Sequence, residues 1–141
     1  MKGMSSKRLI LAAATVAGAG ILIAAQQPSA LAQAKPGLWE IGGLPGAAAP
    51  PHECVSDLLA LARFEHRKGN CSSKVIRDAA SSTIIEYSCA GGGFGRSQVD
   101  VLTPRSLRIS TQGISDGLPF NYVLQARRVG DCPKSTSASR H

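Results

Sequence analysis

The chain of 141 residues is short of aromatic side chains, with one Trp, two Tyr and three Phe. Nucleic-acid binding needs stacking aromatics beside a clustered basic face. Here the Lys and Arg residues are scattered, apart from the pair Arg127-Arg128. Methionine is equally scarce, because Met1 and Met4 are the only two. The composition therefore predicts no nucleic-acid partner, and it excludes a copper site built from methionines of the body.

Several spacings that carry chemistry are also missing. No two cysteines are separated by two residues, the arrangement typical of structural zinc sites. No Gly-x-Ser-x-Gly elbow is present. The run from Gly91 to Gly95 lacks the Lys-Ser/Thr ending of a phosphate-binding loop and precedes a predicted strand, so a turn is the preferred interpretation. We therefore predict no catalytic residues, no cofactor and no metal.

The chain begins with the pattern of an export leader. Basic residues at positions 2, 7 and 8 precede an apolar run from Leu9 to Ala25, and Ala30-Leu31-Ala32 offers small residues beyond it. This pattern predicts a signal peptide over residues 1–32, cleaved after Ala32, and a periplasmic protein whose mature form does not span the membrane. An uncleaved anchor is the alternative, because about 17 apolar residues are barely enough to cross a bilayer.

The body that follows is short enough for a single domain over residues 33–133, and it carries all four cysteines. An even cysteine count in a small exported domain indicates disulfides. A hairpin centred on Ala80 would place Cys71 opposite Cys89, which leaves Cys54 to pair with Cys132. We predict these two bridges, and a disordered tail over residues 134–141 because that segment has no apolar anchor.

The rest of the body is predicted to be mainly β (an α+β fold). Apolar and polar residues alternate over residues 83–89, 98–101, 107–112 and 120–127, the period of a half-buried strand, and 38–41 forms a short first strand. The connections are short, which favours antiparallel neighbours. We expect an antiparallel meander of about six strands, curled or barrel-like, stapled by the two disulfides.

One segment departs from the strand period. Val55, Leu58, Leu59 and Ala62 recur at helical spacing after Pro50-Pro51, with Ser56 available as a cap and Gly69 as a stop. This predicts one short helix that packs on the concave side of the sheet. Along such a helix His52 and His66 would lie about 20 Å apart, so we interpret both as surface histidines rather than as shared metal ligands.

Four aromatic residues on predicted strands are the candidates for lining a ligand pocket: Trp39, Tyr87, Phe120 and Tyr122. For Trp39 the preferred interpretation is a core plug, because a small sheet must bury its largest side chain. The carboxylates of Glu40, Glu86 and Asp100 are interpreted as single charges on the wet side of the sheet.

The ends of the body resemble a known family. The segment Lys35-Pro36-Gly37-Leu38-Trp39-Glu40, the run Cys54-Val55-Ser56, Glu86 before Cys89, and Arg128-Val129-Gly130-Asp131-Cys132-Pro133 resemble the small exported bacterial domain-of-unknown-function 3617 family. The resemblance implies an exported, disulfide-bearing β domain without an assigned reaction or cofactor, so it supplies no functional residues.

Three classes of function remain open from the sequence. The preferred one is a non-catalytic envelope module that binds an apolar or amphipathic small molecule, or another protein, on the concave side of its sheet. The second is an inhibitor or accessory subunit of an envelope enzyme, with Arg127-Arg128 as a positive contact. The third is a hydrolase with an unrecognised site.

Overall fold

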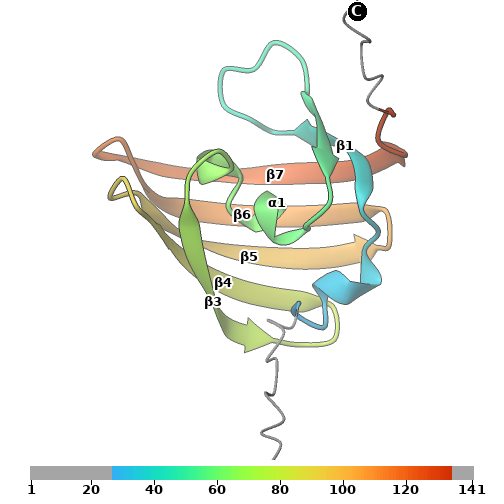
Figure 1. The fold of residues 1–141 in the computed structure, drawn as a ribbon, viewed down its shortest axis with the longest axis horizontal. Coiled ribbons are helices and arrows are strands. Elements are labelled where there is room, and N and C mark those ends of the chain that lie inside the picture. The colour runs from blue at the N-terminus through green and yellow to red at the C-terminus, as the bar shows by residue number, and fades with distance from the viewer. Residues whose placement is uncertain (1–26, 135–141) are drawn as a thin grey trace, which may run out of the picture.

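The computed structural model describes residues 27–134, which form one seven-stranded antiparallel sheet with one short α-helix (Figure 1). The strands are β1 (Gly37–Gly42), β2 (His52–Val55), β3 (Cys71–Asp78), β4 (Ser82–Cys89), β5 (Phe94–Thr103), β6 (Ser106–Ser115) and β7 (Leu118–Gly130). Their order in the sheet is β2-β1-β7-β6-β5-β4-β3. The five C-terminal strands are therefore a meander, and β1 and β2 extend it beyond β7.

The β3–β4 hairpin has the register that the alternation predicts. Val75 lies opposite Ile85 and Ser73 opposite Tyr87, and Cys71 lies opposite Cys89. The two cysteines form a disulfide with a Cα–Cα distance of 3.9 Å. A bulge between Val75 and Arg77 shifts the register by one residue towards the turn. The predicted cross-strand pairing of Cys71 with Cys89 is confirmed.

The second predicted disulfide is also present, because Cys54 on β2 bonds Cys132, which follows β7. Its Cα–Cα distance is 5.4 Å and its sequence separation is 78 residues. β2 lies at one edge of the sheet and pairs only with β1. The bridge therefore ties an edge strand to the end of the chain's longest strand.

The predicted extent of the helix is wrong at both ends, because the α-helix starts after Val55 and Ser56 and ends at Ala62, well before the predicted stop at Gly69. Val55 belongs to β2, and the helix α1 covers only Leu59–Ala62, followed by the 3-10 turn η2 at Phe64–His66. The backbone N–H of Leu59 donates to the Asp57 carboxylate, so Asp57 rather than Ser56 caps the turn. The expected six strands become seven because residues 52–55 pair with β1 instead of leading into the helix.

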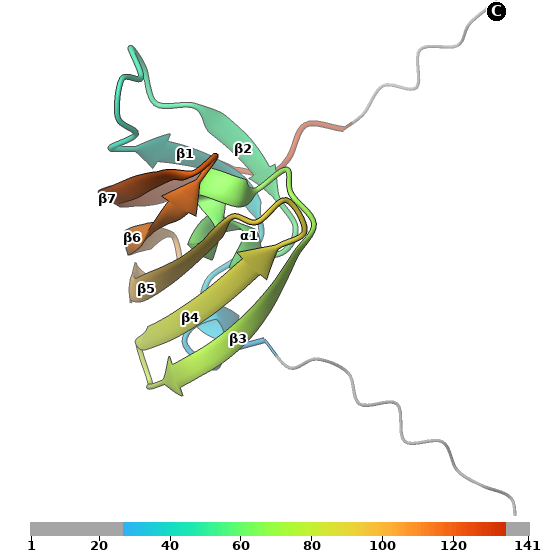
Figure 2. The ribbon, with the colours of Figure 1, turned by 90° about the vertical axis from the view of Figure 1, so that its left-hand side faces the viewer.

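The sheet curls around α1 without closing (Figure 2). Within residues 27–134, β2 and β3 are the edge strands of the sheet, and each pairs with a single neighbouring strand. The expected curled meander is thus confirmed, and the barrel-like form is not reached. We call the face that carries α1 the inner face and the opposite one the outer face.

The core lies between the inner face and α1 with η2. Its largest fully buried side chains include Trp39 and Ile41 from β1, Ile109 from β6, and Leu61 and Phe64 from the helical segment. A buried polar contact fixes the helix on the sheet, because the Ser97 hydroxyl bonds the carbonyl of Ala62 and lies 2.8 Å from Thr111 Oγ1. Because a buried hydroxyl without a partner would destabilise the fold, this contact favours one position of the helix on the sheet.

The segment ahead of β1 packs against the domain. It contains the 3-10 turn η1 (Leu31–Gln33), and Ala30 and Leu31 are fully buried. The backbone N–H groups of Ser29 and Ala30 donate to the Asp78 carboxylate on β3, and these bonds lower the pKa of Asp78. The predicted cleavage position after Ala32 therefore falls within a folded turn. The remainder of the predicted leader, residues 1–26, and the predicted tail from 135 onwards lie outside the described residues.

Two disulfides are typical of an oxidising extracellular or periplasmic environment. Within residues 27–134 no helix is long and apolar enough to cross a membrane.

Candidate functional site

A pocket lies on the outer face, where three rows of residues run across β3 to β7 in register. It has a volume of about 890 Å³ and is open to solvent, and we call it the outer trough. The first row is Lys74, Glu86, Arg96, Gln112 and Asn121. The floor row is Ser73, Tyr87, Gly95, Gly113 and Phe120. The third row is Ser72, Ser88, Phe94 and Ile114.

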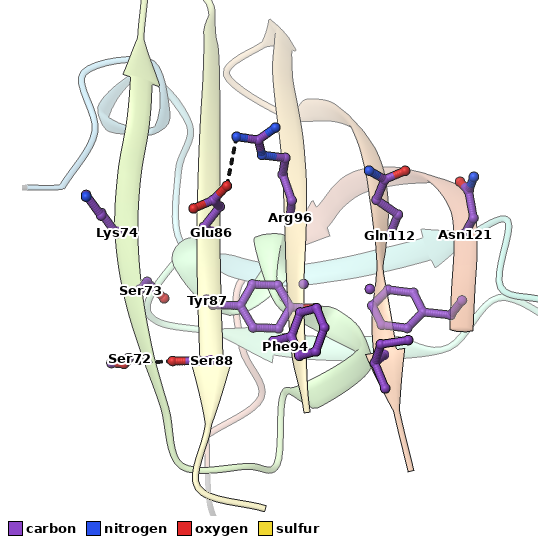
Figure 3. A pocket seen from close by; sticks show the side chains of 14 residues that line it. Ser72, Ser73, Lys74, Glu86, Tyr87, Ser88, Phe94, Arg96, Gln112 and Asn121 are labelled. Carbon is purple, nitrogen blue, oxygen red and sulfur yellow. Dashed lines mark hydrogen bonds and ion pairs between the residues drawn. The ribbon is translucent and has the colours of Figure 1, made fainter. Parts of the chain in front are cut away.

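Strand geometry explains why three rows form a trough. Successive side chains of a strand point to opposite faces, so the first and third rows stand on the outer face and the floor row points inward. Figure 3 shows the first row on one side of the trough, with Ser72, Ser88 and Phe94 on the other. Two members of the floor row, Gly95 and Gly113, have no side chain at all. The floor of the trough is therefore largely backbone.

An aromatic ring on the inner face requires glycine at position 95, whereas Gly113 is required first by the backbone of β5, since an added Cβ would meet the Phe94 carbonyl oxygen and lie 2.6 Å from Cα of Gly95. A Cβ on Gly95 would lie 2.5 Å from the Tyr87 hydroxyl oxygen, and one on Gly113 would lie 2.9 Å from Cζ of Phe120. Each ring thus lies across the glycine of the neighbouring strand, which is a common way to compensate a glycine in a sheet. The glycines keep the trough floor low and also make room for the rings beneath it.

The walls of the trough differ in chemistry. In the first row Glu86 and Arg96 form an ion pair with an N–O distance of 2.7 Å. In the third row Phe94 is 53% exposed, although it is a large apolar residue in a strand. The hydroxyls of Ser72 and Ser88 lie 3.4 Å apart at the β3–β4 end. One wall therefore offers charged and amide groups, and the other offers an aromatic ring beside two hydroxyls.

An inner-face aromatic cluster lies beneath this region. The imidazole of His66 packs against the rings of Tyr87 and Phe120, with centroid distances of 5.5 and 5.8 Å, and Phe120 also contacts Tyr122. Nδ1 of His66 is 3.3 Å from the Tyr87 hydroxyl. The 3-10 turn η2 supplies His66, so this turn covers the cluster. The cluster fills the inner face where the aliphatic core ends.

The Tyr122 hydroxyl donates a hydrogen bond of 2.6 Å to the Glu65 carboxylate. Partial burial and this carboxylate both raise the pKa of Tyr122 well above its ordinary value. Burial is also the main cause of the raised pKa of Tyr87. Both phenols therefore stay protonated at neutral pH and act as hydrogen-bond donors or packing groups.

The structure brings together three of the four predicted pocket residues. Tyr87, Phe120 and Tyr122 meet in the inner-face cluster, and the first two also belong to the trough floor. Trp39 lies elsewhere, because it is fully buried in the core and its indole N–H donates to the Lys35 carbonyl.

The other predicted groups remain separate. His52 lies 3.4 Å from Glu40, which also pairs with Arg127, whereas Asp100 accepts hydrogen bonds from Ser82 and Gln98. His52 and His66 have different partners, and the described residues contain no cluster of metal-ligating side chains. The glycines from 91 to 93 form the turn between β4 and β5.

No family model matches this chain, and no curated protein or solved structure matches it. The resemblance to the domain-of-unknown-function 3617 family therefore stays a prediction from short motifs.

Sequence reasoning missed Lys74, Phe94 and the two floor glycines as members of one site. Gly95 and Gly113 are 18 positions apart and meet only because the β5–β6 hairpin pairs them. Each breaks the apolar alternation of its strand at an inner-facing position, and this interruption is the signal in the sequence that marks a close approach.

Proposed function

We propose that this protein is a non-catalytic binding module that holds an amphipathic small molecule in the outer trough. The observation that carries the proposal is the half-exposed ring of Phe94 facing a row of charged and amide side chains across a floor of glycine backbone. Ligand sites combine apolar surface with a few polar groups that fix orientation, in volumes of roughly 300–1,000 Å³. The outer trough fits that description.

The proposed site differs from the one expected on the concave side of the sheet. That side is filled by α1, η2 and the aromatic cluster, and Trp39 is enclosed in the core. The inner face therefore packs the core that stabilises the domain, and the proposed binding site lies on the outer face. We also propose that the protein is exported to the periplasm through a cleaved leader and belongs to the domain-of-unknown-function 3617 family.

Native mass spectrometry of protein isolated from its own envelope tests this function. We expect a small molecule to remain bound and to be lost in the Phe94→Asp variant. Leu102→Asp is the matched control, because Leu102 is 59% exposed near the other end of the same strand and does not line the trough. Equal retention by both variants, or no bound molecule on the unsubstituted protein together with no binding of added amphiphiles, would refute the proposal.

A protein partner is the second candidate, and the free edge at β3 favours it. Seven of the eight residues of β3 are exposed, and the strand pairs only with β4. An edge of this kind accepts an added strand from another chain. The pair Arg127-Arg128 is less suited to a partner, because Arg127 binds Glu40 and Arg128 binds Asp131. Crosslinking in the envelope that recovers a stoichiometric protein through β3 would support this candidate.

A hydrolase is the weakest of the three candidates. Among the hydrogen bonds of the described residues, His66 contacts Tyr87, and His52 is near Glu40. Neither histidine contacts a serine hydroxyl there, and all four cysteines are in disulfides. An activated nucleophile needs a base within hydrogen-bond reach.

A further inference from the structure

The outer trough has two chemically different ends. The β3–β4 end carries the hydroxyls of Ser72 and Ser88 and the side chain of Lys74, all on the outer face. The β5–β7 end carries Phe94 and Ile114 in the third row and Arg96, Gln112 and Asn121 in the first row. Figure 3 shows Lys74 on the first-row side and Ser72 and Ser88 on the opposite side of the trough, all three on β3 and β4. Along the third row, polarity thus changes from hydroxyls on β3 and β4 to apolar side chains on β5 and β6, whereas the first row is polar on every strand.

The hydroxyl end carries an unneutralised positive charge. The trough has three charged side chains, and two of them, Glu86 and Arg96, neutralise each other at 2.7 Å. Among the described residues no carboxylate lies within ion-pair distance of Lys74. Lysine offers three N–H donors, and each serine adds an O–H donor. This end therefore complements a small anion.

The net charge of the chain also favours a negatively charged ligand. The formal net charge is +7, which becomes +4 once Lys2, Lys7 and Arg8 leave with the proposed leader (13 basic and 9 acidic residues remain), and a positive field raises the local concentration of anions at the surface. Glu86 is the only carboxylate in the trough, and its charge is offset by Arg96.

At the β5–β7 end, the third row continues into exposed apolar surface. Phe94 pairs with Ile114, which pairs with Pro119, and Leu118 at the start of β7 is 70% exposed. An alkyl chain laid here would cover apolar surface that water otherwise contacts. Three strand spacings separate β3 from β6, which is about 14 Å at the usual spacing of neighbouring strands. The trough therefore suits a molecule with an anionic head and one apolar chain along that span.

We propose that the ligand of the outer trough is a fatty acid, with its carboxylate at Lys74, Ser72 and Ser88 and its chain over Gly95 and Gly113 against Phe94. This inference rests on the proposed function, and it adds the sign of the head group and the direction of the chain. A single carboxylate matches one uncompensated ammonium, and the narrow backbone floor accommodates a single chain.

Isothermal titration of the full chain with octanoate and with 1-octanol tests the proposal, because the two probes share a chain and differ in head group. We expect octanoate to bind up to about fivefold more tightly at low salt, the size of one exposed charge interaction. The preference should shrink as salt is raised, since exposed charges are screened. Lys74→Gln should remove the preference by weakening octanoate binding more than octanol binding, whereas Lys68→Gln, outside the trough, should leave both unchanged.

The possible failures are distinguishable. Equal affinities for the two probes, both reduced by Phe94→Ala, would overturn the fatty-acid inference and leave the amphipathic site standing. A preference for octanoate that survives Lys74→Gln would also overturn it. If neither probe binds, or if Phe94→Ala changes nothing, the proposed function fails as well.

Discussion

The phenol ring of Tyr87 lies directly over Gly95 of the neighbouring strand, where an added Cβ would be 2.5 Å from the hydroxyl oxygen. Gly95→Ala should therefore destabilise the domain by about 1–3 kcal/mol, the usual cost of overpacking a well-filled site. Urea unfolding followed by circular dichroism measures the change. Gly91→Ala is the matched control, because a methyl group added at Gly91 would have no atom within 4 Å and the backbone there is unstrained. Equal stabilities of the two variants would contradict the proposed packing.

Removing the disulfides should have unequal effects. The chain-entropy estimate gives about 3 kcal/mol for the Cys71–Cys89 loop and about 4.5 kcal/mol for the longer Cys54–Cys132 loop. We expect the Cys54→Ala/Cys132→Ala double variant to be less stable than the Cys71→Ala/Cys89→Ala double variant, as measured by thermal and urea unfolding. If the variant without the Cys71–Cys89 bridge were the less stable one, the edge strand β2 would contribute little to the part of the domain that unfolds cooperatively.

The bond between Tyr122 and Glu65 makes an alkaline stability prediction. Folding raises the pKa of Tyr122 above its unfolded-state pKa, which is near 10. The contribution of the Tyr122 hydroxyl to the free energy of unfolding is therefore complete below pH 10 and is lost as the pH rises further. Tyr122→Phe should cost about 1.5–3 kcal/mol at pH 7, the range of a hydrogen bond to a charged group. The difference in unfolding free energy between the unsubstituted protein and the Tyr122→Phe variant, measured by urea unfolding, should shrink above pH 10. A difference that stays constant from pH 7 to 11 would argue against the bond.

The buried turn before β1 can be tested in exported protein. If Leu31 is retained after processing, Leu31→Ala should lower the free energy of unfolding by about 2–4 kcal/mol, because the residue is fully buried. Intact mass of the same sample gives the N-terminal residue directly. An unchanged stability with Gln33 as the first residue would place the cut after Ala32 and remove this turn from the mature domain.

Local patterns predicted much of this fold. The alternation from Thr83 to Cys89 and the turn at Ala80 were enough to fix the β3–β4 register and one disulfide. β2 escaped prediction because four residues show too little periodicity, and Val55 also matched the helical spacing of the next segment. In that conflict strand pairing with β1 prevailed over a local pattern.

The candidate site was much harder to predict. Its rows combine residues from β3 to β7, so they exist only once the order and register of the whole meander are known. The aromatic candidates Tyr87 and Phe120 were identifiable as a residue type, but their inward direction follows from packing against His66. Sequence alternation indicates which residues share a face, and the tertiary structure decides which face stays open.

The most direct test of a binding site on the outer face is amide chemical-shift mapping of isotope-labelled protein during titration with octanoate. We predict the largest shifts at Lys74, Phe94, Gly95 and Gly113, with saturation, and little change at Trp39 in the core. Shifts centred on Trp39 and the inner face, or none that saturate, would contradict it.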